Sequence, residues 1–432
     1  MVECYQLHPA RRIVGICRVP GDKSITHRAL MLSALAAGRS VLTGCLLAAD
    51  TLATVHALTA MGVAIDQEAA NQTVTVNGVG LHGLAPPEAP LDLANAGTAM
   101  RLFAGLLAGQ AFGATLVGDA SLMRRPMQRV VDPLRAMGAA ISAHNGCAPL
   151  RLEAVDAIHP IIYDLPVASA QLKSAVLFAA MYASGTTVVR EHSVTRDHTE
   201  RMLRAFGYPL KQHAQQISLQ GGHPLVPLNI EIPGDFSSAA FLMVAALLVP
   251  GADLLLKNVG INPTRTALVD ILESMGARIS ISPAEGSAFE PVADIRVFSS
   301  VLHGVDVPPE RVANAIDELP VLMIAAAAAR GRTVITGAKE LRVKESDRIH
   351  AMVSGLKALG VSVSEYPDGV AIDGGSLSGG VVESFGDHRV AMAFAVAACV
   401  AKGPVVINDI ACIATSFPQF KTLTDSIGFC YQ

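Results

Sequence analysis

The chain has 432 residues, of which 51% are hydrophobic and 16% are charged, and its formal net charge is −4. This length favours two or three domains, and the apolar content excludes wholesale disorder. The slightly acidic balance argues against general nucleic-acid binding, so any anion site must gather its positive charge locally.

The seven cysteines are scattered and form no Cys-x-x-Cys pair. This pattern argues against a zinc site or a secreted disulfide framework and favours a reducing compartment. Residues 1–12 show no apolar core of a signal peptide. The most apolar run, 237–252, is interrupted by Pro250-Gly251 and is short for a membrane span, so it predicts a buried helix. We therefore expect a cytoplasmic protein.

The most informative segment is Pro-Gly-Asp-Lys-Ser-Ile-Thr-His-Arg at 20–28. It joins a predicted strand at 13–17 to a predicted helix at 29–37, which Gly38 ends. Lys23, Ser24 and Arg28 therefore lie at a helix start, where free N–H groups and the helix dipole attract anions, and Ser24 can cap the helix. We interpret the segment as a site for phosphate or carboxylate. A capped helix with two solvated charges is the structural alternative.

An internal repeat sets the predicted architecture. The motif Pro-Gly-Asp-x-Ser at 20–24 recurs at 233–237, which indicates duplication into two halves. A finer repeat of about 70 residues ends each time in an apolar residue and a glycine, the expected residue just past a helix. These glycines are Gly62, Gly138, Gly207, Gly276, Gly360 and Gly428.

Within the units, short predicted strands such as 73–76 and 186–189 alternate with helices such as 170–182 and 320–329. We therefore predict an α/β fold with three units in each half. A ligand would bind in the cleft between the halves.

Further polar clusters begin other predicted helices. Residues 93–101 form a small-residue turn that would let a ligand approach the backbone, and 118–127 place two arginines before a proline. Lys173 opposes the dipole of its helix, which favours an anion-binding role. The Arg-x-His-x-Glu spacing at 196–200 resembles a metal site only loosely and has no second ligand cluster, so we expect no metal.

In the second half, Asp317 and Glu318 precede an apolar helix, either as caps or with Asp317 as a base. Residues 342–348 carry five charges, which would form either a solvated helical face or two cations around a carboxylate. Together, the helix starts present Lys23, Arg28, Arg125, Lys173, Arg196, Lys344, Arg348 and Arg389. This predicts binding of one or two small, highly anionic molecules, and the lack of a Gly-rich nucleotide loop argues against nucleotide.

These motifs, in their order, resemble the 5-enolpyruvylshikimate-3-phosphate synthase family over nearly the whole chain. The motifs are PGDKSITHR (20–28), NAGTAMRL (95–102), GDASLMRRPM (118–127), SAQLKS (169–174), TRDHTERML (195–203), PGDFSSAAF (233–241), NPTRT (262–266), LRVKESDR (341–348), GDHRVAMAF (386–394) and TSFPQF (415–420). The resemblance implies an inside-out α/β barrel of two lobes, each of three βαβαββ units. Lobe I would contain 1–20 and 234–432, lobe II would contain 21–233, and the active site would lie in the cleft between them.

The resemblance also implies the reaction. The carboxyvinyl group of phosphoenolpyruvate would pass to the 5-hydroxyl of shikimate 3-phosphate by addition and elimination, on the shikimate pathway to chorismate and aromatic amino acids. No metal or organic cofactor would take part. The protein would be a cytoplasmic monomer with no nucleic-acid or membrane partner, and glyphosate is a candidate inhibitor. Pro20-Gly21 and Pro233-Gly234 suggest hinges for closure of the lobes on ligand.

Site residues follow from the resemblance by position. Asp317 is expected to be the base for the 5-hydroxyl, Glu345 the acid at the methylene carbon, and Lys23 a further catalytic group. The expected shikimate 3-phosphate ligands are Lys23, Ser24, Arg28, Ser169, Ala170, Gln171, Arg196, Asp317 and Lys344. The expected phosphoenolpyruvate ligands are Lys23, Gly97, Arg125, Gln171, Arg348 and Arg389.

The chain departs from the family pattern at Ala94, where a glycine is usual, and at Ala170 and Thr415, where one branch has serine and lysine. The runs at 169–173, 196–200, 262–265 and 345–348 resemble the glyphosate-tolerant branch, whereas Gly97 is the residue of sensitive members, so the sequence leaves the glyphosate response undecided. The sister family that acts on a UDP-amino-sugar is rejected, because Ser24 follows Lys23 and no cysteine lies near Arg125. A non-catalytic anion-binding protein on the same fold is the alternative function.

Overall fold

The computed structural model describes residues 3–284 and 289–432, and these form two compact units. Unit 1 contains 3–20, 233–284 and 291–432, and unit 2 contains 21–232 together with Phe289 and Glu290. The chain enters unit 2 at Gly21 and re-enters unit 1 at Pro233, one residue before the predicted boundary. Among the helices described, none is long and apolar enough to cross a membrane.

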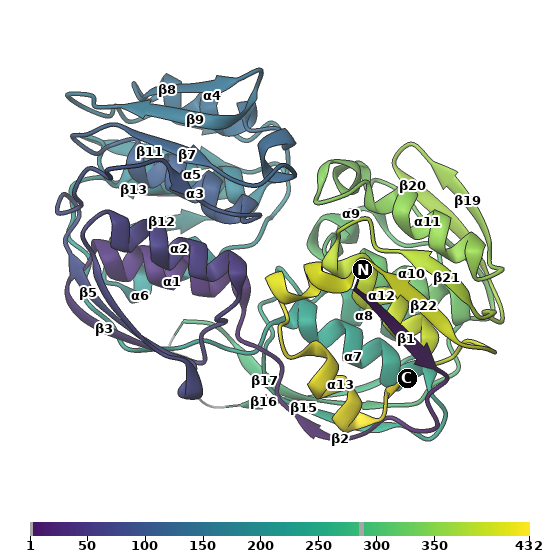
Figure 1. Ribbon diagram of the computed structural model, residues 1–432. Coiled ribbons are helices and arrows are strands. Elements are labelled where there is room, and N and C mark those ends of the chain that lie inside the picture. The colour runs from purple at the N-terminus through teal and green to yellow at the C-terminus, as the bar shows by residue number, and fades with distance from the viewer. Residues whose placement is uncertain (1–2, 285–288) are drawn as a thin grey trace. The chain divides into compact units, whose positions relative to one another are not determined.

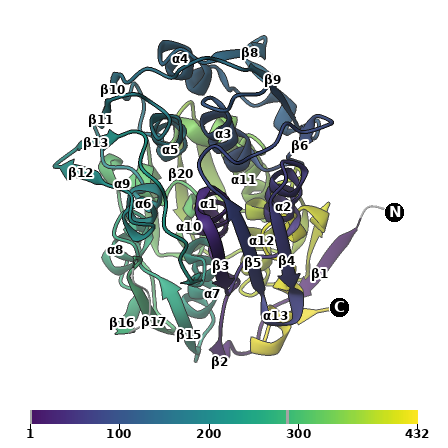
Figure 2. The same ribbon diagram turned by 90° about the vertical axis from the view of Figure 1, so that its left-hand side faces the viewer.

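Unit 2 contains three successive repeats in its described residues, and each builds one sheet. Figure 2 shows strands β3, β5 and β4 of its first sheet side by side. The first repeat consists of α1 (Lys23–Leu35), β3 (Ala37–Thr43), α2 (Ala49–Ala60), β4 (Ala64–Glu68), β5 (Thr73–Val79) and the late strand β14 (Ile230–Glu231). The second consists of β6 (Leu91–Asp92), α3 (Gly97–Leu107), β7 (Ala114–Val117), α4 (Gln128–Ala136), β8 (Ala140–His144) and β9 (Cys147–Glu153). The third consists of β10 (Ile162–Asp164), α5 (Ala170–Ala180), β11 (Thr186–Arg190), α6 (His198–Ala205), β12 (Leu210–His213) and β13 (Gln216–Gln220).

Unit 1 repeats the same plan, with three further sheets formed by its described residues (Figure 1). The first repeat consists of β2 (Val14–Cys17), α7 (Phe236–Leu248), β15 (Asp253–Gly260), α8 (Ala267–Ser274), β16 (Arg278–Ala284) and β17 (Val292–Phe298). The second consists of α9 (Pro309–Val312), α10 (Leu319–Ala328), β18 (Gly331–Ile335), α11 (Arg348–Ala358), β19 (Ser362–Tyr366) and β20 (Gly369–Gly374). The third consists of β21 (Gly380–Glu383), α12 (His388–Ala398), β22 (Val405–Asn408), α13 (Phe420–Ile427), β23 (Cys430–Tyr431) and β1 (Cys4–His8).

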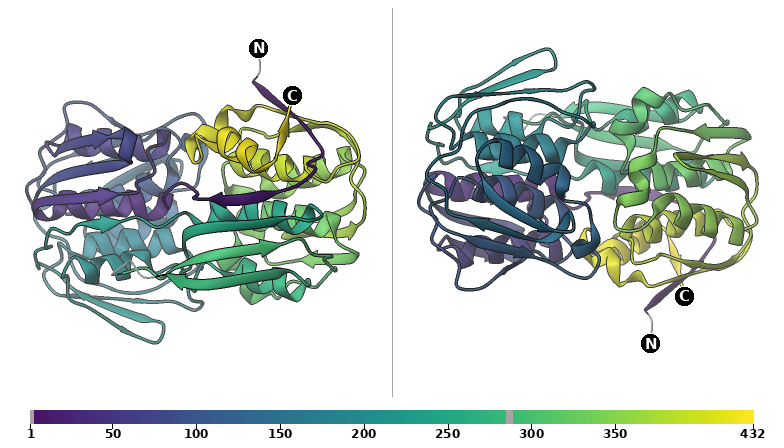
Figure 3. Two further views of the ribbon diagram at one scale, coloured as in Figure 1. Left: turned by 90° about the horizontal axis from the view of Figure 1, so that it is seen from below. Right: turned by 90° about the horizontal axis from the view of Figure 1, so that it is seen from above.

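Among the described residues, five of the six sheets share one four-stranded topology, whereas β18-β20-β19 has three strands joined only by antiparallel pairs. In β6-β7-β9-β8, for example, the first pair of strands is parallel and the other pairs are antiparallel. Strands adjacent to the chain crossings complete the first repeat of each unit. Strand β14 pairs in parallel with β3. Strand β2, purple in Figure 3 (left), pairs in parallel with the teal strand β15. Because β2 precedes the first crossing yet pairs within unit 1, that unit is discontinuous in sequence. The predicted α/β fold of three units per lobe is confirmed.

The predicted glycine caps are also confirmed. All six glycines that end the repeat helices have positive φ angles, from 75° at Gly207 to 115° at Gly428. A residue with a side chain is strained in this left-handed conformation, whereas glycine adopts it freely. The regular glycine spacing in the sequence therefore corresponds to a helix in each repeat that ends at a glycine with positive φ.

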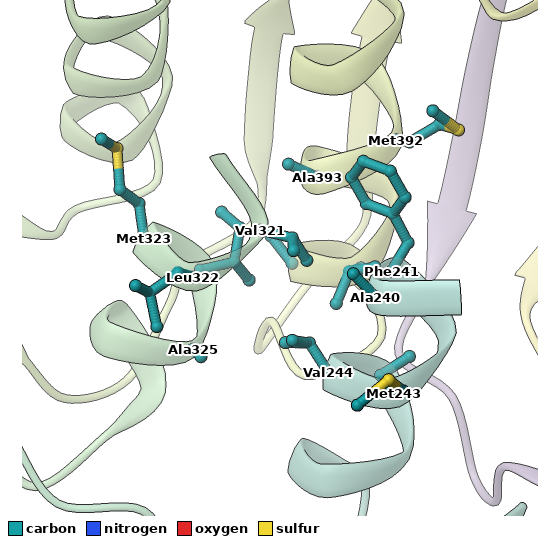
Figure 4. Packing of buried hydrophobic residues seen from close by; sticks show 14 of the residues in the cluster. Ala240, Phe241, Met243, Val244, Val321, Leu322, Met323, Ala325, Met392 and Ala393 are labelled. Atoms are coloured by element: carbon teal, nitrogen blue, oxygen red, sulfur yellow. The ribbon is translucent and has the colours of Figure 1, made fainter. Parts of the chain in front are cut away.

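Helices α7, α10 and α12 form the interior of unit 1. They are buried nearly all round, as their uniformly apolar sequences require. Figure 4 shows Phe241 and Val244 of α7, Val321 of α10 and Ala393 of α12 packed together. The apolar run at 237–252 is thus a buried helix, as predicted. Helices α1, α3 and α5 occupy the same place in the core of unit 2.

One predicted element had wrong boundaries. The first helix was placed at 29–37, but α1 begins at Lys23 and ends at Leu35. Asp22 accepts a hydrogen bond from the backbone N–H of Ile25 at 2.8 Å, so Asp22 caps the helix and Ser24 lies inside its first turn. The Lys-Ser pair is therefore held more rigidly than a loop would hold it.

Candidate active site

The first turns of the inner helices meet at one end of unit 2. Arg28 of α1 donates from Nη2 to the hydroxyl of Ser174 on α5 at 2.9 Å. Gln171 of α5 donates from Nε2 to Thr98 Oγ1 on α3 at 2.8 Å. Several helix N-termini, each with a partial positive charge, are thereby brought to one place. Such an arrangement favours an anion with several oxygens.

Arg28 is buried, and its guanidinium is held by neutral groups. Besides Ser174, it donates from Nε to Thr199 Oγ1 on α6 at 2.7 Å and from Nη1 to the carbonyl of Ser24 at 3.0 Å. Burial lowers the pKa of Arg28 to about 10, with nearby Glu200 opposing that shift. A cation that is desolvated but held by hydroxyls gains much from an incoming phosphate.

Lys23 and Ser24 are half-buried beside Arg28 at the start of α1, and Lys23 forms an ion pair with the buried carboxylate of Asp50. Ser169 caps α5 by accepting from the backbone N–H of Leu172 at 3.3 Å, so Ala170 is the first residue of the helix. Arg196 is half-buried and lies near enough for its charge to lower the pKa of Arg28. Unit 2 therefore brings its predicted shikimate 3-phosphate ligands together.

Lys173 does not have the anion-binding role that we predicted from its position. Its side chain has no exposed surface, and its Nζ lies 2.6 Å from Glu200 Oε1 and 3.0 Å from Glu191 Oε2. Glu191 also accepts from the backbone N–H of Thr195 at 3.2 Å. The lysine thus fixes the segment that carries Arg196, and its opposition to the helix dipole is offset by two carboxylates rather than by a ligand.

The loosely metal-like spacing at 196–200 is also used for structure. His198 Nδ1 lies 2.6 Å from Glu290 Oε1, and both side chains are buried. Glu200 pairs with Lys173. Each of these two side chains thus has a protein partner.

Gly97 lies between two guanidinium groups. A Cβ atom at this position would lie 2.8 Å from Arg125 Nη1 and 3.1 Å from Arg101 Nη1. Arg125 is buried and donates to Asn95 Oδ1, and Arg101 donates from Nη1 to Gln171 Oε1 at 2.7 Å. The absence of a side chain at Gly97 keeps these groups close together. Sequence reasoning missed Arg101, although it stands one helical turn after Gly97 in the same motif.

Ala94, a departure from the family pattern, has a φ angle of 49°. This left-handed conformation disfavours alanine and suits glycine. The usual glycine at this position thus has a physical reason, and this chain carries local strain instead.

In unit 1, Asp317 stands among three cations. Its Oδ1 lies 3.3 Å from Arg348 Nη1 and 3.9 Å from Lys344 Nζ, and its Oδ2 lies 3.8 Å from Arg389 Nη2. Arg389 also donates to the backbone carbonyl of Asp317 at 2.9 Å. The carboxylate retains 14% exposure, so a substrate hydroxyl can reach it. These are the properties of a general base.

Arg348 is almost completely buried and binds three carboxylates. It donates to Glu345 Oε2 at 2.6 Å from Nη2, to Asp387 Oδ2 at 2.7 Å from Nε, and to Asp317 at 3.3 Å from Nη1. The two candidate proton-transfer carboxylates, Asp317 and Glu345, are therefore linked through one guanidinium. The carboxylates raise the pKa of Arg348 far above its ordinary value although burial opposes them.

Asp387 is the residue of this cluster that sequence reasoning passed over. It has no exposed surface, caps α12 by accepting from the backbone N–H of Arg389 at 2.9 Å, and accepts from Ser346 at 3.2 Å. Burial alone would raise the pKa of Asp387, but the charge of Arg348 outweighs it, and the pKa is lowered. The sequence signal for this role was the position of Asp387 at a predicted helix start, directly before His388 and Arg389.

The helical face proposed for 342–348 is wrong. A 3-10 turn, Lys339–Val343, ends before Lys344, and α11 begins at Arg348 with Asp347 as its cap. Lys344 and Glu345 therefore lie on irregular backbone before the helix. This places them beside Asp317 instead of on a solvated helix surface.

Comparison with known proteins agrees with this geometry. Residues 7–423 match the family described as EPSP synthase (3-phosphoshikimate 1-carboxyvinyltransferase). A 3-phosphoshikimate 1-carboxyvinyltransferase of Acidithiobacillus ferrooxidans is 54% identical over 424 residues, which cover 98% of each chain. The protein of that name from Methylococcus capsulatus is 53% identical over 421 residues, covering 97% of this chain and 96% of the relative.

Solved structures agree as well. The EPSP synthase of Acinetobacter baumannii superimposes with a TM-score of 0.89 and 46% identity, covering 99% of each chain. The enolpyruvyl transferase NikO from Streptomyces tendae has a TM-score of 0.79 at 17% identity, with coverage of 100% of this chain and 99% of that one, and this likeness concerns the fold alone.

Proposed function

The chain belongs to the EPSP synthase (3-phosphoshikimate 1-carboxyvinyltransferase) family and is a carboxyvinyltransferase of the shikimate pathway, and from this premise we propose how its residues carry out the reaction. The observation that carries the proposal is the linkage of Asp317 and Glu345 through the buried Arg348, with Lys344 and Arg389 around them. Two reachable carboxylates beside cations suit a reaction that needs two proton transfers between anionic substrates.

Shikimate 3-phosphate is bound mainly by unit 2. Its phosphate lies at the starts of α1 and α5, where the dipoles and hydroxyls favour an anion. Arg28 contributes a charge already desolvated, which an approaching phosphate oxygen stabilises. The complete set is Lys23, Ser24, Arg28, Ser169, Ala170, Gln171 and Arg196 from unit 2, with Asp317 and Lys344 from unit 1.

Phosphoenolpyruvate is clamped by cations. Arg125 and the neighbouring backbone of Gly97 bind it from unit 2, with Lys23 and Gln171, and Arg348 and Arg389 bind it from unit 1. Asp387 keeps the Arg348 side chain in place, because it accepts from both Nε and Nη2, while Nη1 donates to Asp317 and Nη2 also donates to Glu345. The substrate carboxylate and phosphate compete with those two residues for the guanidinium.

The addition step needs two protons moved. Asp317 accepts the proton of the 5-hydroxyl as that oxygen attacks C2 of phosphoenolpyruvate, and Glu345 donates a proton to the methylene carbon, which becomes a methyl group. In the elimination step Glu345 takes a proton back from the methyl group, the double bond re-forms, and the C2–O bond to phosphate breaks. Lys23 neutralises the charge that develops on the leaving phosphate. The remaining rate acceleration comes from holding both substrates in the orientation that the reaction needs.

We assign no metal or organic cofactor to this reaction, and we propose that the enzyme acts as a cytoplasmic monomer without a nucleic-acid or membrane partner. Placement in the glyphosate-tolerant branch is supported by the Arg-Asp-His-Thr-Glu run at 196–200 and the Asn-Pro-Thr-Arg run at 262–265. Gly97 is the opposing feature, because a side chain at this position would displace the guanidinium of Arg125. A titration of glyphosate against phosphoenolpyruvate decides between tolerance and sensitivity.

The test is release of phosphate from shikimate 3-phosphate and phosphoenolpyruvate, with the organic product identified by mass spectrometry. The proposal predicts release that requires both substrates and yields one carboxyvinyl ether for each phosphate. Release without shikimate 3-phosphate would indicate a phosphatase. Binding of shikimate 3-phosphate without release would indicate the non-catalytic alternative.

A further inference from the structure

Glu318 follows Asp317 in the chain but contacts entirely different groups. Its side chain has no exposed surface, and it stands at the start of α10 without a side-chain capping bond. Asp317 contacts the site cations, whereas Glu318 contacts Ser237 and Arg265 in the core of unit 1. Two adjacent carboxylates are thus divided between the site and the interior.

The interior contacts form a chain of polar groups. Ser237 in the first turn of α7 donates to Glu318 Oε1, and Arg265 Nη2 lies 3.6 Å from the same oxygen. Arg265 Nη2 also donates to Ser237 Oγ at 2.6 Å and lies 3.3 Å from Asp235 Oδ1. Since Asp235 caps α7, the network joins the starts of α7 and α10.

Joining two helices through this network costs more free energy than joining them through apolar contacts. Glu318 Oε2 is buried without a hydrogen-bond partner among the described residues, and removing charges from water costs several kcal/mol for each ion. The helices already pack through apolar side chains such as Val244 and Val321 (Figure 4). Apolar side chains often replace a buried ion pair without loss of stability. Stability alone therefore gives a weak reason for the pair.

We propose that Glu318 and Arg265 are positioning residues, which fix the backbone at the start of α10 so that the Asp317 carboxylate stays among its cations. This inference rests on the role proposed above for Asp317. Glu318 donates its backbone N–H to the carbonyl of Ala315 at 2.9 Å, so the turn is short, and movement of Glu318 moves Asp317 with it.

The site is sensitive to such a movement. The charged groups that face Asp317 are Lys344 at 3.9 Å, Arg348 at 3.3 Å from the start of α11, and Arg389 at 3.8 Å from the start of α12. Two of these distances are already near the limit of an ion pair, so a shift of about 1 Å breaks them. Misplacement of about 1 Å can cost about 100-fold in rate.

The test compares variants of the intact enzyme by thermal unfolding, by kcat and KM for both substrates, and by the pH dependence of kcat. The double variant Arg265→Met/Glu318→Leu removes both charges at similar volume. We expect it to unfold within a few degrees of the wild type, to lose at least about tenfold in kcat, and to keep both KM values within about threefold. The acidic limb of its kcat profile moves to higher pH, because a carboxylate farther from cations holds its proton more tightly.

The control is Leu322→Ala, which removes a fully buried side chain from the same helix without touching the network. It lowers the unfolding temperature, but kcat and the acidic limb stay unchanged below that temperature. A double variant with wild-type kcat and an unmoved limb overturns the proposal. If the double variant fails to fold, Glu318→Gln replaces it. We expect this variant to lose less kcat and to show the same shift of the acidic limb to higher pH. A wild-type kcat and an unmoved limb in Glu318→Gln would overturn the proposal. A wild-type enzyme without turnover would overturn both this inference and the proposed function.

Discussion

Replacement of Lys173 by methionine tests whether this buried lysine stabilises unit 2. Lys173, Glu191 and Glu200 have side chains with at most 2% exposure, and the ammonium lies within 3.0 Å of both carboxylates. Methionine has a similar length and no charge. The substitution therefore leaves two carboxylates in the core without their cation.

The expected cost follows from the partners that remain. Glu191 keeps its hydrogen bonds from Thr195, whereas Glu200 loses the ion pair with Lys173. Removal of one partner from a buried ion pair costs about 3–5 kcal/mol, and we expect a loss in this range at pH 8.

The loss should depend on pH. Burial raises the pKa of Glu200 while Lys173 opposes the shift, so the variant raises this pKa further. The folded state then binds a proton more tightly than the unfolded state, and its stability falls as pH rises through the interval between the two pKa values. The loss should accordingly be smaller at pH 5 than at pH 8.

Urea unfolding monitored by circular dichroism at both pH values measures the effect, with two transitions analysed separately if the units unfold independently. Lys257→Met, which breaks the partly exposed pair with Asp294, is the control and should cost at most about 1 kcal/mol. The double variant Lys173→Met/Glu200→Gln should recover part of the loss. A loss below about 1 kcal/mol for Lys173→Met, or an equal loss at both pH values, would refute the reasoning.

Three further predictions concern substitutions at Gly97, Ala94 and Asp387. Gly97→Ala places a Cβ 2.8 Å from Arg125 Nη1, so the guanidinium has to shift. We expect KM for phosphoenolpyruvate to rise about tenfold while the unfolding midpoint is unchanged, and a KM equal to wild type would contradict this. Ala94→Gly relieves a left-handed alanine and should stabilise unit 2 by about 0.5–1 kcal/mol in urea unfolding, whereas destabilisation would show that the strain is absent. Asp387→Asn removes a buried partner of Arg348 and should cost about 3 kcal/mol at pH 7. Because the pKa of Asp387 is lowered by folding, its contribution is present above about pH 4 and lost as pH falls further, so the Asn variant and wild type should converge in strong acid.

Much of the fold could be predicted because its repeat is visible in local sequence. Each glycine that ends a repeat helix has a positive φ angle, and the apolar inner helices are recognised without knowledge of their partners. The duplicated Pro-Gly-Asp motif at 20–22 and 233–235 lies where the chain passes between the two units.

The functions of individual charges were harder to predict, because they depend on groups distant in sequence. Lys173 was read as an anion ligand, and its two partners, Glu191 and Glu200, lie 18 and 27 residues away. Ser24 was read as a cap because its type fits, but Asp22 competes for the same N–H groups and accepts the capping bond. The roles of Asp387 and Arg101 could not be predicted, because each depends on a partner distant in sequence. Asp387 accepts from Arg348, and Arg101 donates to Gln171.

The central claim is that Glu345 moves the proton at the methylene carbon, and the most direct measurement is single-turnover phosphate release by Glu345→Gln with both substrates present. The matched control is Glu365→Gln, which removes a carboxylate of the same unit that pairs with Arg342 at 3.0 Å instead of Arg348. We predict that Glu345→Gln binds shikimate 3-phosphate normally and releases phosphate at least about 100-fold more slowly, as loss of a general acid requires, while Glu365→Gln matches the wild type. Phosphate release by Glu345→Gln at the wild-type rate would contradict the account.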